Sequence, residues 1–364
     1  MPTVITVAGT RPEAIKVAPL LAGFRQFPAL RSLYCVTAQH RQMLDQVHEW
    51  FGLVPDIDLS LMEPGQTLSG FAAKALSGLS AVFAEQKPDC VVVQGDTTTA
   101  MMAALAAAYQ KIPVAHVEAG LRTGEFFNPF PEEINRRVIS AATRFHFAPT
   151  EQAATALRNE GIPPAWIHVT GNTVIDALRM TALREVEAAV ELPEGPLVLI
   201  TAHRRESFGG PLESICRALR RLADENPDAV LVYPVHLNPN VREPVLRILG
   251  GHPRIHLTEP QRYEQFVHWM KRASLILTDS GGIQEEAPFL RVPVLVMRDT
   301  TERPEAVAAG AAKLVGTEED RIVGEASRLL RDPLARQVMS QAGSPFGDGY
   351  AAARIAAVLA EALS

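Results

Sequence analysis

Short apolar runs alternate with amphipathic helical patterns along almost the whole chain, and this alternation restricts the possible folds more than any other feature. The first apolar run, residues 3–8 (TVITVA), precedes a helical segment that opens near Pro12, and proline is favoured in the first turn of a helix. Strands that alternate with helices in this way are typical of βαβ units in a parallel sheet. The sequence therefore predicts an α/β fold.

The strand-like runs form two series, which indicates two domains. They comprise residues 3–8, 33–37, 90–93, 114–117, 145–148 and 167–170, and then residues 197–201, 230–233, 255–257, 275–278 and 292–297. A chain of 364 residues is also long for a single hydrophobic core. A helix is predicted over residues 177–190, before a Pro- and Gly-containing turn. We place the domain boundary near Gly171, between two α/β halves of similar size.

Charge, hydropathy and cysteine content exclude several classes of protein. A net charge of -6 argues against bulk affinity for nucleic acid. No apolar run approaches the roughly 20 residues of a membrane-spanning helix, and no basic segment of a secretory signal opens the chain. Cys35, Cys90 and Cys216 are widely separated and odd in number, which predicts buried thiols rather than disulfides or a metal site. We expect a cytoplasmic protein that binds a metabolite.

Residues 275–286 (LILTDSGGIQEE) have the pattern of a strand, a tight turn and the start of a helix. Asp279 and Ser280 offer capping groups, and Gly281 and Gly282 would let backbone N–H groups approach a bound anion at the helix N-terminus. A capped turn without a ligand is equally compatible with this stretch taken alone. The two glutamates that follow are expected in the first helical turn, where they suit the helix dipole or accept hydrogen bonds from a ribose.

Polar residues follow most of the predicted strands, and ligands of parallel α/β sheets bind beyond these strand ends. In the first half they are Arg11, Glu13, Lys16, Gln39, His40, Arg41, Asp96, Thr97, Glu118 and Arg122. In the second half they are His203, Arg204, Arg205, Glu206, His236, Asn238, Ser280, Gly281, Gly282 and Glu286. Any one of them is more often a solvated loop residue, but their repetition predicts a cleft between the halves. Arginine and lysine there suit a diphosphate, and the carboxylates suit proton transfer.

Two common nucleotide-binding motifs are excluded. Residues 347–352 match a dinucleotide glycine fingerprint, but no predicted strand precedes them and no βαβ unit can follow. No GxxxxGK[ST] loop is present in the sequence, so ATP hydrolysis by a P-loop is not expected.

Ten motifs together resemble the non-hydrolysing UDP-N-acetylglucosamine 2-epimerases, and they cover almost the whole chain in order. They are GTRPEAIK (9–16), TAQHRQMLDQV (37–47), GDTTT (95–99), HVEAGLRTG (116–124), PEEINR (131–136), GNTVIDA (171–177), HRRESFG (203–209), YPVHLNPNVREPV (233–245), LTDSGGIQEEAP (277–288) and RDTTERPEAV (298–307). A set of motifs in this order is far more specific than any single one.

The resemblance implies two Rossmann-like domains with a cleft between them, similar to the GT-B glycosyltransferases. It implies an N-terminal domain of residues 1–171 with the final helix, residues 350–364, and a UDP-binding domain of residues 172–349. The implied reaction interconverts UDP-N-acetylglucosamine and UDP-N-acetylmannosamine by elimination of UDP to a 2-acetamidoglucal and re-addition. The implied enzyme needs no nicotinamide cofactor or metal, forms a homodimer and serves polysaccharide biosynthesis.

Residue by residue, the motif match assigns acid-base roles to Asp96, Glu118 and Glu132, with His203 supporting the leaving group. From the residues alone, Asp96 equally suits a helix cap, Glu118 an ion pair with Arg122, and Glu132 a first-turn acid. The positions that match contacts to UDP or the sugar are Arg11, Lys16, His203, Ser280, Gly281, Gly282 and Glu286.

Bacterial members of the family can also bind a second UDP-N-acetylglucosamine as an activator. Gln39, His40, Gln42 and His236 resemble that second site. Lys74 is a departure, because an arginine is often expected there and lysine lacks the bidentate geometry of a guanidinium.

Three other functions fit parts of the pattern. A retaining-type glycosyltransferase of the same fold would only slowly hydrolyse UDP-N-acetylglucosamine given alone, and a hydrolysing epimerase would release free N-acetylmannosamine. A nucleotide-sugar sensor would bind the ligand unchanged, but it has little use for several acidic loop residues, whose burial is costly.

Overall fold

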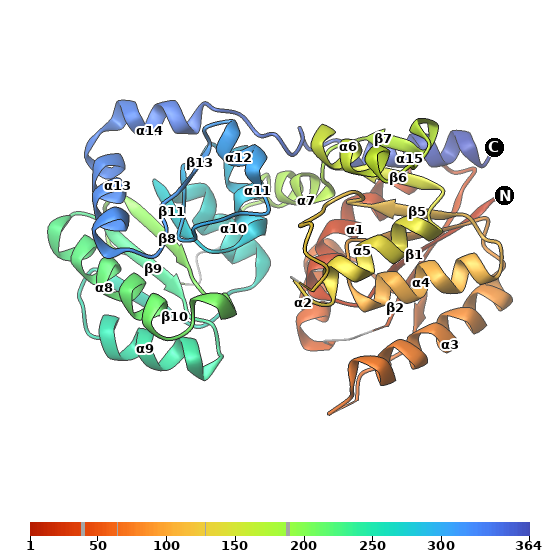
Figure 1. Cartoon of the computed structure of the whole chain (residues 1–364), viewed down its shortest axis with the longest axis horizontal. Coiled ribbons are helices and arrows are strands. Elements are labelled where there is room, and N and C mark those ends of the chain that lie inside the picture. The colour runs from red at the N-terminus through yellow and green to blue at the C-terminus, as the bar shows by residue number, and fades with distance from the viewer. Residues whose placement is uncertain (38–40, 64, 128, 187–189) are drawn as a thin grey trace. The chain divides into compact units, whose positions relative to one another are not determined.

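The computed structural model describes residues 1–37, 41–63, 65–127, 129–186 and 190–364 (Figure 1). Contacts divide them into two compact units, unit 1 comprising Met1–Met180 with Phe346–Ser364, and unit 2 comprising Thr181–Pro345. The domain boundaries expected near residues 171 and 350 stay a prediction about which segments fold independently.

Unit 1 contains a parallel sheet with the strand order β3-β2-β1-β4-β5-β6-β7. The strands are β1 (Thr3–Ala8), β2 (Arg31–Val36), β3 (Ile57–Asp58), β4 (Cys90–Gln94), β5 (Val114–Val117), β6 (Phe145–Ala148) and β7 (Ile167–Val169). Its central strands are buried along their whole length, as expected for strands covered on both faces. Successive residues face opposite sides, so Val4 and Ile5 belong to two different hydrophobic clusters.

Helices supply the partners for both faces of this sheet. They are α1 (Arg11–Phe24), α2 (Arg41–Phe51), α3 (Leu68–Gln86), α4 (Thr98–Tyr109), α5 (Glu132–Ala142), α6 (Glu151–Asn159), a 3-10 turn η1 (Pro164–Trp166), α7 (Thr173–Ala182) and α15 (Ala351–Ala362). Helices α3 and α4 contribute to the cluster that contains Ile5, and α15 contributes to the cluster that contains Val4. The last helix of the chain therefore completes the core formed by the first strand.

Unit 2 contains a second parallel sheet, with the order β10-β9-β8-β11-β12-β13. Its strands are β8 (Leu197–Thr201), β9 (Val230–Pro234), β10 (Ile255–Thr258), β11 (Leu275–Thr278), β12 (Val294–Val296) and β13 (Ala312–Leu314). Its helices are η2 (Arg205–Ser207), α8 (Gly210–Glu225), α9 (Pro239–Leu249), α10 (Tyr263–Arg272), α11 (Gly281–Phe289), α12 (Pro304–Ala308), α13 (Glu319–Arg331) and α14 (Pro333–Ser340). A core of Leu, Ile and Val side chains joins α8, α9 and α13 to the sheet.

The α/β fold and the predicted strands are confirmed, with differences of a few residues at their ends. The sequence missed β3 and β13, which have two and three residues and are too short to show a periodicity. The helix predicted over residues 177–190 is wrong in its bounds. Helix α7 starts at Thr173, because the side chain of Asn172 accepts a hydrogen bond from the Val174 N–H at 3.1 Å, and it ends at Ala182.

The three thiols are free and buried, as predicted, and burial raises the pKa of each to about 12. None of the described helices is long and apolar enough to cross a bilayer. Within the same residues, no group of three or more His, Cys, Asp and Glu side chains is arranged to hold a metal ion.

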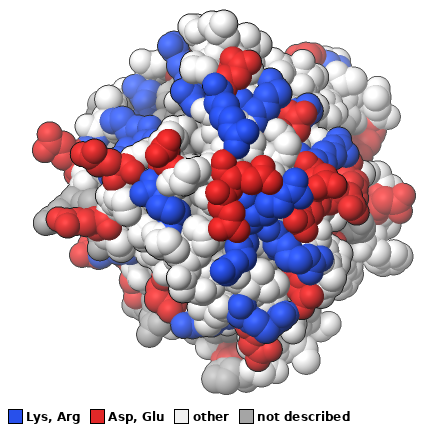
Figure 2. Space-filling model, turned by 90° about the vertical axis from the view of Figure 1, so that its left-hand side faces the viewer, with Lys and Arg blue, Asp and Glu red and all other residues white. Residues whose placement is uncertain are grey.

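On the face of unit 2 shown in Figure 2, acidic and basic side chains alternate instead of forming a patch of one sign. Helices α8 and α13 are joined by ion pairs, such as Arg221 with Asp320 at 2.6 Å and with Glu319 at 3.4 Å. Exposed pairs of this kind contribute little individually to stability. The pairing leaves this face without the basic stripe of a nucleic-acid interface.

Candidate functional site

The turns after two neighbouring strands of unit 1 carry the first two candidate carboxylates. Strand β4 pairs with β5, and the chain then leads from Gln94 to Asp96 and from Val117 to Glu118. Because both strands are parallel, both turns lie at the same edge of the sheet. The sequence-based expectation that strand ends gather polar groups therefore has a direct counterpart in this unit.

Glu118 is held by two partners of different character. Its Oε2 accepts a hydrogen bond from the Gln94 amide at 2.5 Å and forms an ion pair with Lys16 on α1. The residue is buried and has a φ of 69°, a left-handed conformation that non-glycine residues rarely adopt. Arg122 pairs with Glu160 at 2.7 Å. The carboxylate of Glu118 is thus placed beside Lys16 at the strand end.

Residues of α5 form hydrogen bonds with both the backbone and the side chain of Asp96. Its Oδ2 accepts hydrogen bonds from Arg136 at 2.9 Å (Nε) and 2.8 Å (Nη2), and its carbonyl accepts one from Asn135 at 2.7 Å. The following helix is capped by Thr97, whose hydroxyl accepts from the Ala100 N–H at 3.1 Å. Asp96 therefore has no capping role, and 29% of its side chain is exposed.

Glu132 is the first residue of α5, where the sequence predicts the helix start. As a first-turn acid it suits the helix dipole. Its Oε2 is buried, however, and has no hydrogen-bond partner among the described residues. A buried carboxylate oxygen without a donor is uncommon in folded proteins, and it distinguishes Glu132 from the paired carboxylates Asp96 and Glu118.

The turn between β1 and α1 places Arg11 and Lys16 on the first helix, and Glu13 fixes that turn. Its carboxylate accepts hydrogen bonds from the Gly9 N–H at 3.0 Å, the Thr10 N–H at 2.7 Å and the Thr97 hydroxyl at 2.6 Å. Burial raises the pKa of Glu13, and these hydrogen bonds oppose the rise. Glu13, which the sequence marks only as a polar strand-end residue, thus ties the β1 turn to the β4 turn.

In unit 2 the Ser-Gly-Gly turn lies at the end of β11, as predicted, and α11 begins at Gly281. The capping prediction is wrong. Ser280 is the N-cap residue but its side chain makes no capping hydrogen bond, and Asp279 is turned toward the neighbouring loop after β8. No acidic residue lies in the first turn of α11, because Glu285 and Glu286 fall in its second turn. Glu286 is buried there.

Asp279 organises the loop that carries His203. The fully buried carboxylate accepts the backbone N–H groups of His203 at 2.6 Å and Arg204 at 2.7 Å. The His203 Nδ1 lies 3.6 Å from Asp279 Oδ1, and its ring stacks on His236 with centroids 5.4 Å apart. Partial burial lowers the pKa of His203. The neighbouring His236 and Arg204 lower this pKa further, whereas the carboxylate of Asp279 raises it. Neutral imidazole is therefore favoured near neutral pH.

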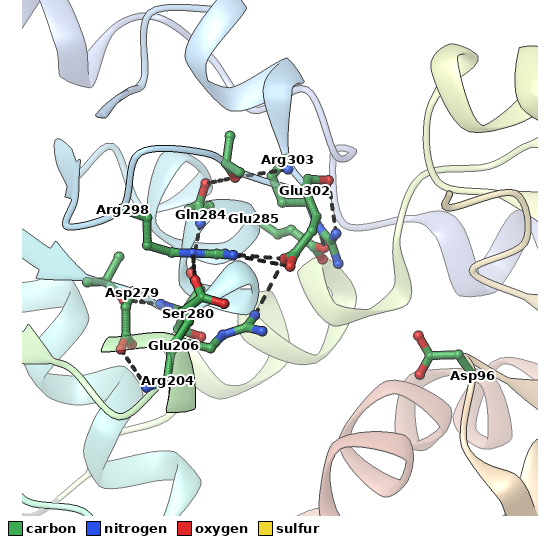
Figure 3. A network of polar contacts seen from close by, with 12 residues as sticks. Asp96, Arg204, Glu206, Asp279, Ser280, Gln284, Glu285, Arg298, Glu302 and Arg303 are labelled. Carbon is green, nitrogen blue, oxygen red and sulfur yellow. Dashed lines mark hydrogen bonds and ion pairs between the residues drawn. The ribbon is translucent and has the colours of Figure 1, made fainter. Parts of the chain in front are cut away.

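Arginines and glutamates alternate around the start of α11 (Figure 3). Glu302 lies between Arg204 at 3.5 Å and Arg298 at 3.4 Å, and Arg298 also bonds Glu206 at 2.6 Å. A separate pair joins Arg303 to Glu285. Burial resists ionisation of Glu302, but Arg204, Arg298 and Arg303 outweigh it and lower its pKa.

The start of α11 lies beside charged side chains of both signs. A Cβ added at Gly281 would lie 3.5 Å from Glu302 Oε2 and 3.6 Å from Arg204 Nη2, so a carboxylate and a guanidinium already lie against the helix start. The helix N-terminus and the nearby guanidinium groups together favour an anion.

The predicted second site is only partly within the described residues. Gln39 and His40 lie outside them, and the side chain of Gln42 is not described. His236 stacks on His203. Lys74 forms an ion pair with Glu63, and both side chains are exposed. The role of these residues stays a prediction.

Sequence reasoning missed several residues that complete the two sites. They are Gln94, Glu133, Arg136, Arg298, Glu302 and Arg303. Arg136, Glu302 and Arg303 occur inside the motifs that carry the family resemblance, but they do not directly follow predicted strands, so the strand-end criterion passed over them.

Two Rossmann-like units with polar groups at the carboxyl ends of parallel strands define the GT-B-like class of α/β proteins. At the level of the fold alone, the glycotransferase of kitacinnamycin is similar, with a TM-score of 0.65 and 12% identity over all of both chains.

The comparisons with known proteins then give the family. Residues 23–360 match the family model described as UDP-N-acetylglucosamine 2-epimerase. A UDP-N-acetylglucosamine 2-epimerase of Escherichia coli K12 is 53% identical over 97% of this chain and 96% of its own length. A UDP-GlcNAc 2-epimerase from Neisseria meningitidis, solved bound to UDP-GlcNAc, is 46% identical with a TM-score of 0.90, over 99% of this chain and 100% of its own. The chain belongs to the UDP-N-acetylglucosamine 2-epimerase family and is an isomerase.

Proposed function

We propose that this enzyme interconverts UDP-N-acetylglucosamine and UDP-N-acetylmannosamine by eliminating UDP and adding it back. The observation that carries the proposal is the grouping of carboxylates in unit 1. Asp96 and Glu118 follow neighbouring strands, and Glu132 lies on α5, the helix that hydrogen-bonds to Asp96. The relative from Neisseria meningitidis binds UDP-GlcNAc, which supports the choice of substrate.

The reaction requires a base and an acid because C2 of the sugar carries an unactivated C–H bond. Removal of the C2 proton with departure of UDP breaks the C1–O bond and forms a C1=C2 double bond, so the electron pair ends on the phosphate oxygen. Return of that oxygen to C1 with protonation of C2 on the opposite face gives the epimer. Atoms and charges balance without water or an oxidant, and the three carboxylates supply the proton carriers.

The groups of unit 2 are assigned to UDP. Gly281 and Gly282 offer backbone N–H groups at the start of α11, beside the guanidinium of Arg204. The Ser280 N–H already donates to the Thr278 hydroxyl at 2.9 Å, so Ser280 is assigned to UDP through its side-chain hydroxyl. Glu286 is assigned to the ribose and His203 to the departing phosphate. Arg11 and Lys16 of unit 1 are assigned to the diphosphate or the sugar. These residues would hold UDP, the leaving group, until it adds back to C1. Exclusion of water would protect the glucal intermediate.

A nuclear magnetic resonance time course in deuterated water tests this function. UDP-N-acetylglucosamine given alone should yield UDP-N-acetylmannosamine, with one deuterium at C2 of each product molecule. Epimer without deuterium would exclude the elimination route. Slow appearance of UDP and free sugar without epimer would indicate a glycosyltransferase. Release of free N-acetylmannosamine would indicate a hydrolysing epimerase, and a ligand that binds but stays unchanged would indicate a sensor.

We also propose that a second UDP-N-acetylglucosamine activates the enzyme through Gln39, His40, Gln42 and His236. The stacking of His236 on His203 supports this, because a ligand that contacts one ring alters the surroundings of the other. The reverse reaction, started with UDP-N-acetylmannosamine alone, should show a lag that added UDP-N-acetylglucosamine removes. Full-rate turnover from the first moment would contradict activation.

A further inference from the structure

We propose that Glu133 is a positioning residue for Asp96, acting through the guanidinium of Arg136. The proposal rests on the proposed function, because it assigns Glu133 a task within the acid-base group of unit 1. Glu133 follows Glu132 directly in α5, but the helix turns its side chain inward, and none of that side chain is exposed.

The contacts form a chain from the protein interior to the candidate site. Glu133 Oε2 accepts a hydrogen bond from Arg136 Nη1 at 3.0 Å, and Arg136 Nε donates to Asp96 Oδ2 at 2.9 Å. The Arg136 guanidinium therefore binds the buried carboxylate of Glu133 with one edge and the partly exposed carboxylate of Asp96 with another. Only 10% of the Arg136 side chain is exposed, so few other positions are open to it.

Two further bonds fix Glu133 itself. Its Oε2 also accepts the Thr123 N–H at 3.1 Å, which ties the loop after β5 to α5. Its Oε1 accepts a bond from Arg137 Nε at 3.3 Å, and the Arg137 guanidinium lies 4.8 Å from the centre of the Phe126 ring. With its oxygens occupied in this way, Glu133 is a fixed anchor for Arg136 rather than a group that meets substrate.

The arrangement makes the orientation of Asp96 depend on a residue that it does not touch. Arginine can bridge two carboxylates because its planar guanidinium presents donors along several edges. If the inner carboxylate is lost, Arg136 keeps only the outer one and gains rotational freedom. A displacement of about 1 Å at a reacting group can lower a rate roughly 100-fold. The loss should therefore appear in kcat, while KM stays almost unchanged.

The test compares Glu133→Gln and Glu133→Asp with the wild-type full-length enzyme. Glu133→Gln removes the charge that faces Arg136, and whichever way the amide turns, its NH2 group meets a donor of Arg136 or of Arg137. We therefore expect kcat to fall about 100-fold with KM within about twofold. Glu133→Asp keeps the charge one methylene further away, so kcat should recover to within about tenfold of wild type. Equal kcat in wild type and Glu133→Gln, or a loss that Glu133→Asp does not reduce, would overturn the proposal.

Glu264→Gln on α10 is the matched control. Glu264 is also buried and paired with an arginine, Arg262, at 2.7 Å, and it belongs to neither candidate site. Its replacement removes the same charge from a buried glutamate paired with an arginine, although Arg262 is 41% exposed and Arg136 only 10%. We expect kcat to stay at the wild-type level. A kcat loss in Glu264→Gln equal to that in Glu133→Gln would show a general effect of losing a buried ion pair and overturn the specific role of Glu133.

A second readout separates this inference from the proposed function. The Arg136 Nε–H resonance should exchange slowly with solvent in the wild type, faster in Glu133→Asp and fastest in Glu133→Gln. If the wild type fails to epimerise but this order of exchange holds, the proposed function is wrong and the positioning is right. An unchanged exchange rate overturns the positioning whatever the reaction is. If Glu133→Gln does not fold, Glu133→Asp alone serves as the test. A kcat and an Arg136 Nε–H exchange rate in Glu133→Asp that both equal the wild-type values would then overturn the positioning role.

Discussion

The two units use contacts between cations and carboxylates in opposite ways. In unit 1 the cations Lys16 and Arg136 hold carboxylates, Glu118 and Asp96, at the ends of neighbouring strands. In unit 2 the carboxylate of Glu302 lies between two arginines beside the start of a helix. The first arrangement presents acids in fixed positions, whereas the second keeps cations close to the N-terminal end of a helix. Under the proposed function, similar sheets would serve proton transfer in one unit and anion binding in the other.

The sharpest way to break this comparison is Asp96→Asn. If unit 1 transfers protons and unit 2 binds UDP, the variant should lose at least about 1000-fold in kcat, within the range expected for general acid-base catalysis. Its Kd for UDP should stay at the wild-type value. Turnover can be followed by nuclear magnetic resonance and UDP binding by calorimetry. Wild-type activity in this variant would remove Asp96 from the chemistry.

The sequence predicts the fold well because both sheets consist of buried parallel strands, whose apolar runs are continuous and easily recognised. It also predicts the strand-end carboxylates, since their place in the chain fixes their place at the sheet edge. The prediction that Glu132 suits the first turn of a helix is confirmed, and prolines and a glycine mark the loop before this helix. Local patterns therefore determine most of the architecture.

The partners of these residues could not be predicted, because they depend on contacts between distant segments. The position of Asp279 before its helix predicts a cap, but its carboxylate accepts backbone N–H groups that precede it by more than 70 residues. The spacing of Glu118 and Arg122, only four residues apart, is compatible with an ion pair, yet Glu118 pairs with Lys16 across 102 residues. Sequence spacing identifies neighbours along one element, and only the packed sheet brings these side chains together.

A second comparison concerns histidines, because the fully buried ones lie in unit 1. Burial lowers the pKa of His116 to about 3 and that of His146 to about 4, and their strands pair at these residues. Within the described part of unit 2 no histidine is buried. A histidine whose pKa is lower in the folded protein than in the unfolded chain, where it is about 6.5, favours the folded state above that pH. This contribution is lost as the pH falls toward the folded-state pKa of about 3 or 4.

His116→Gln tests this contribution by urea unfolding at several pH values. The glutamine amide can still reach the Gly95 carbonyl, which His116 contacts at 2.7 Å, but it does not titrate. Between pH 6.5 and pH 5 the wild type should lose about 1.5 kcal/mol of unfolding free energy relative to the variant. Asp176, whose pKa is raised to about 6 by burial, has the opposite pH dependence, but it is present in both proteins and cancels. A constant difference across this range would contradict the buried neutral state of His116.

In unit 2, Asp279→Asn should weaken UDP binding about tenfold to 30-fold. The amide oxygen can accept the same two backbone N–H groups, but hydrogen bonds to a charged acceptor contribute more than those to a neutral one. The loop with His203 and Arg204 is then less firmly held, and the pKa of His203 should fall because Asp279 raises it. Calorimetry gives the Kd for UDP, and histidine resonances give the titration.

Asp176→Asn is the matched control for this variant in unit 1. Asp176 is also a buried carboxylate with two backbone donors, Ala351 at 3.1 Å and Ala352 at 2.9 Å, at the start of α15. Its replacement should lower the unfolding free energy without changing the Kd for UDP. Equal losses of UDP affinity in the two variants would show that Asp279 acts only through general stability.

The smallest effect is expected from Glu302→Gln, and its direction matters more than its size. Glu302 contacts its two arginines at 3.4–3.5 Å, beyond the range of strong charge-assisted bonds, so it neutralises them without fixing them tightly. Removal of this charge beside Gly281 should let a diphosphate bind about threefold more tightly, with a steeper dependence on salt. Glu325→Gln on α13, where Glu325 pairs with Lys313 at 2.6 Å and Arg328 at 3.2 Å, should leave the Kd for UDP unchanged. Weaker binding in Glu302→Gln would instead mean that Glu302 orients the arginines, and unit 2 would then resemble unit 1 in using one charge to position another.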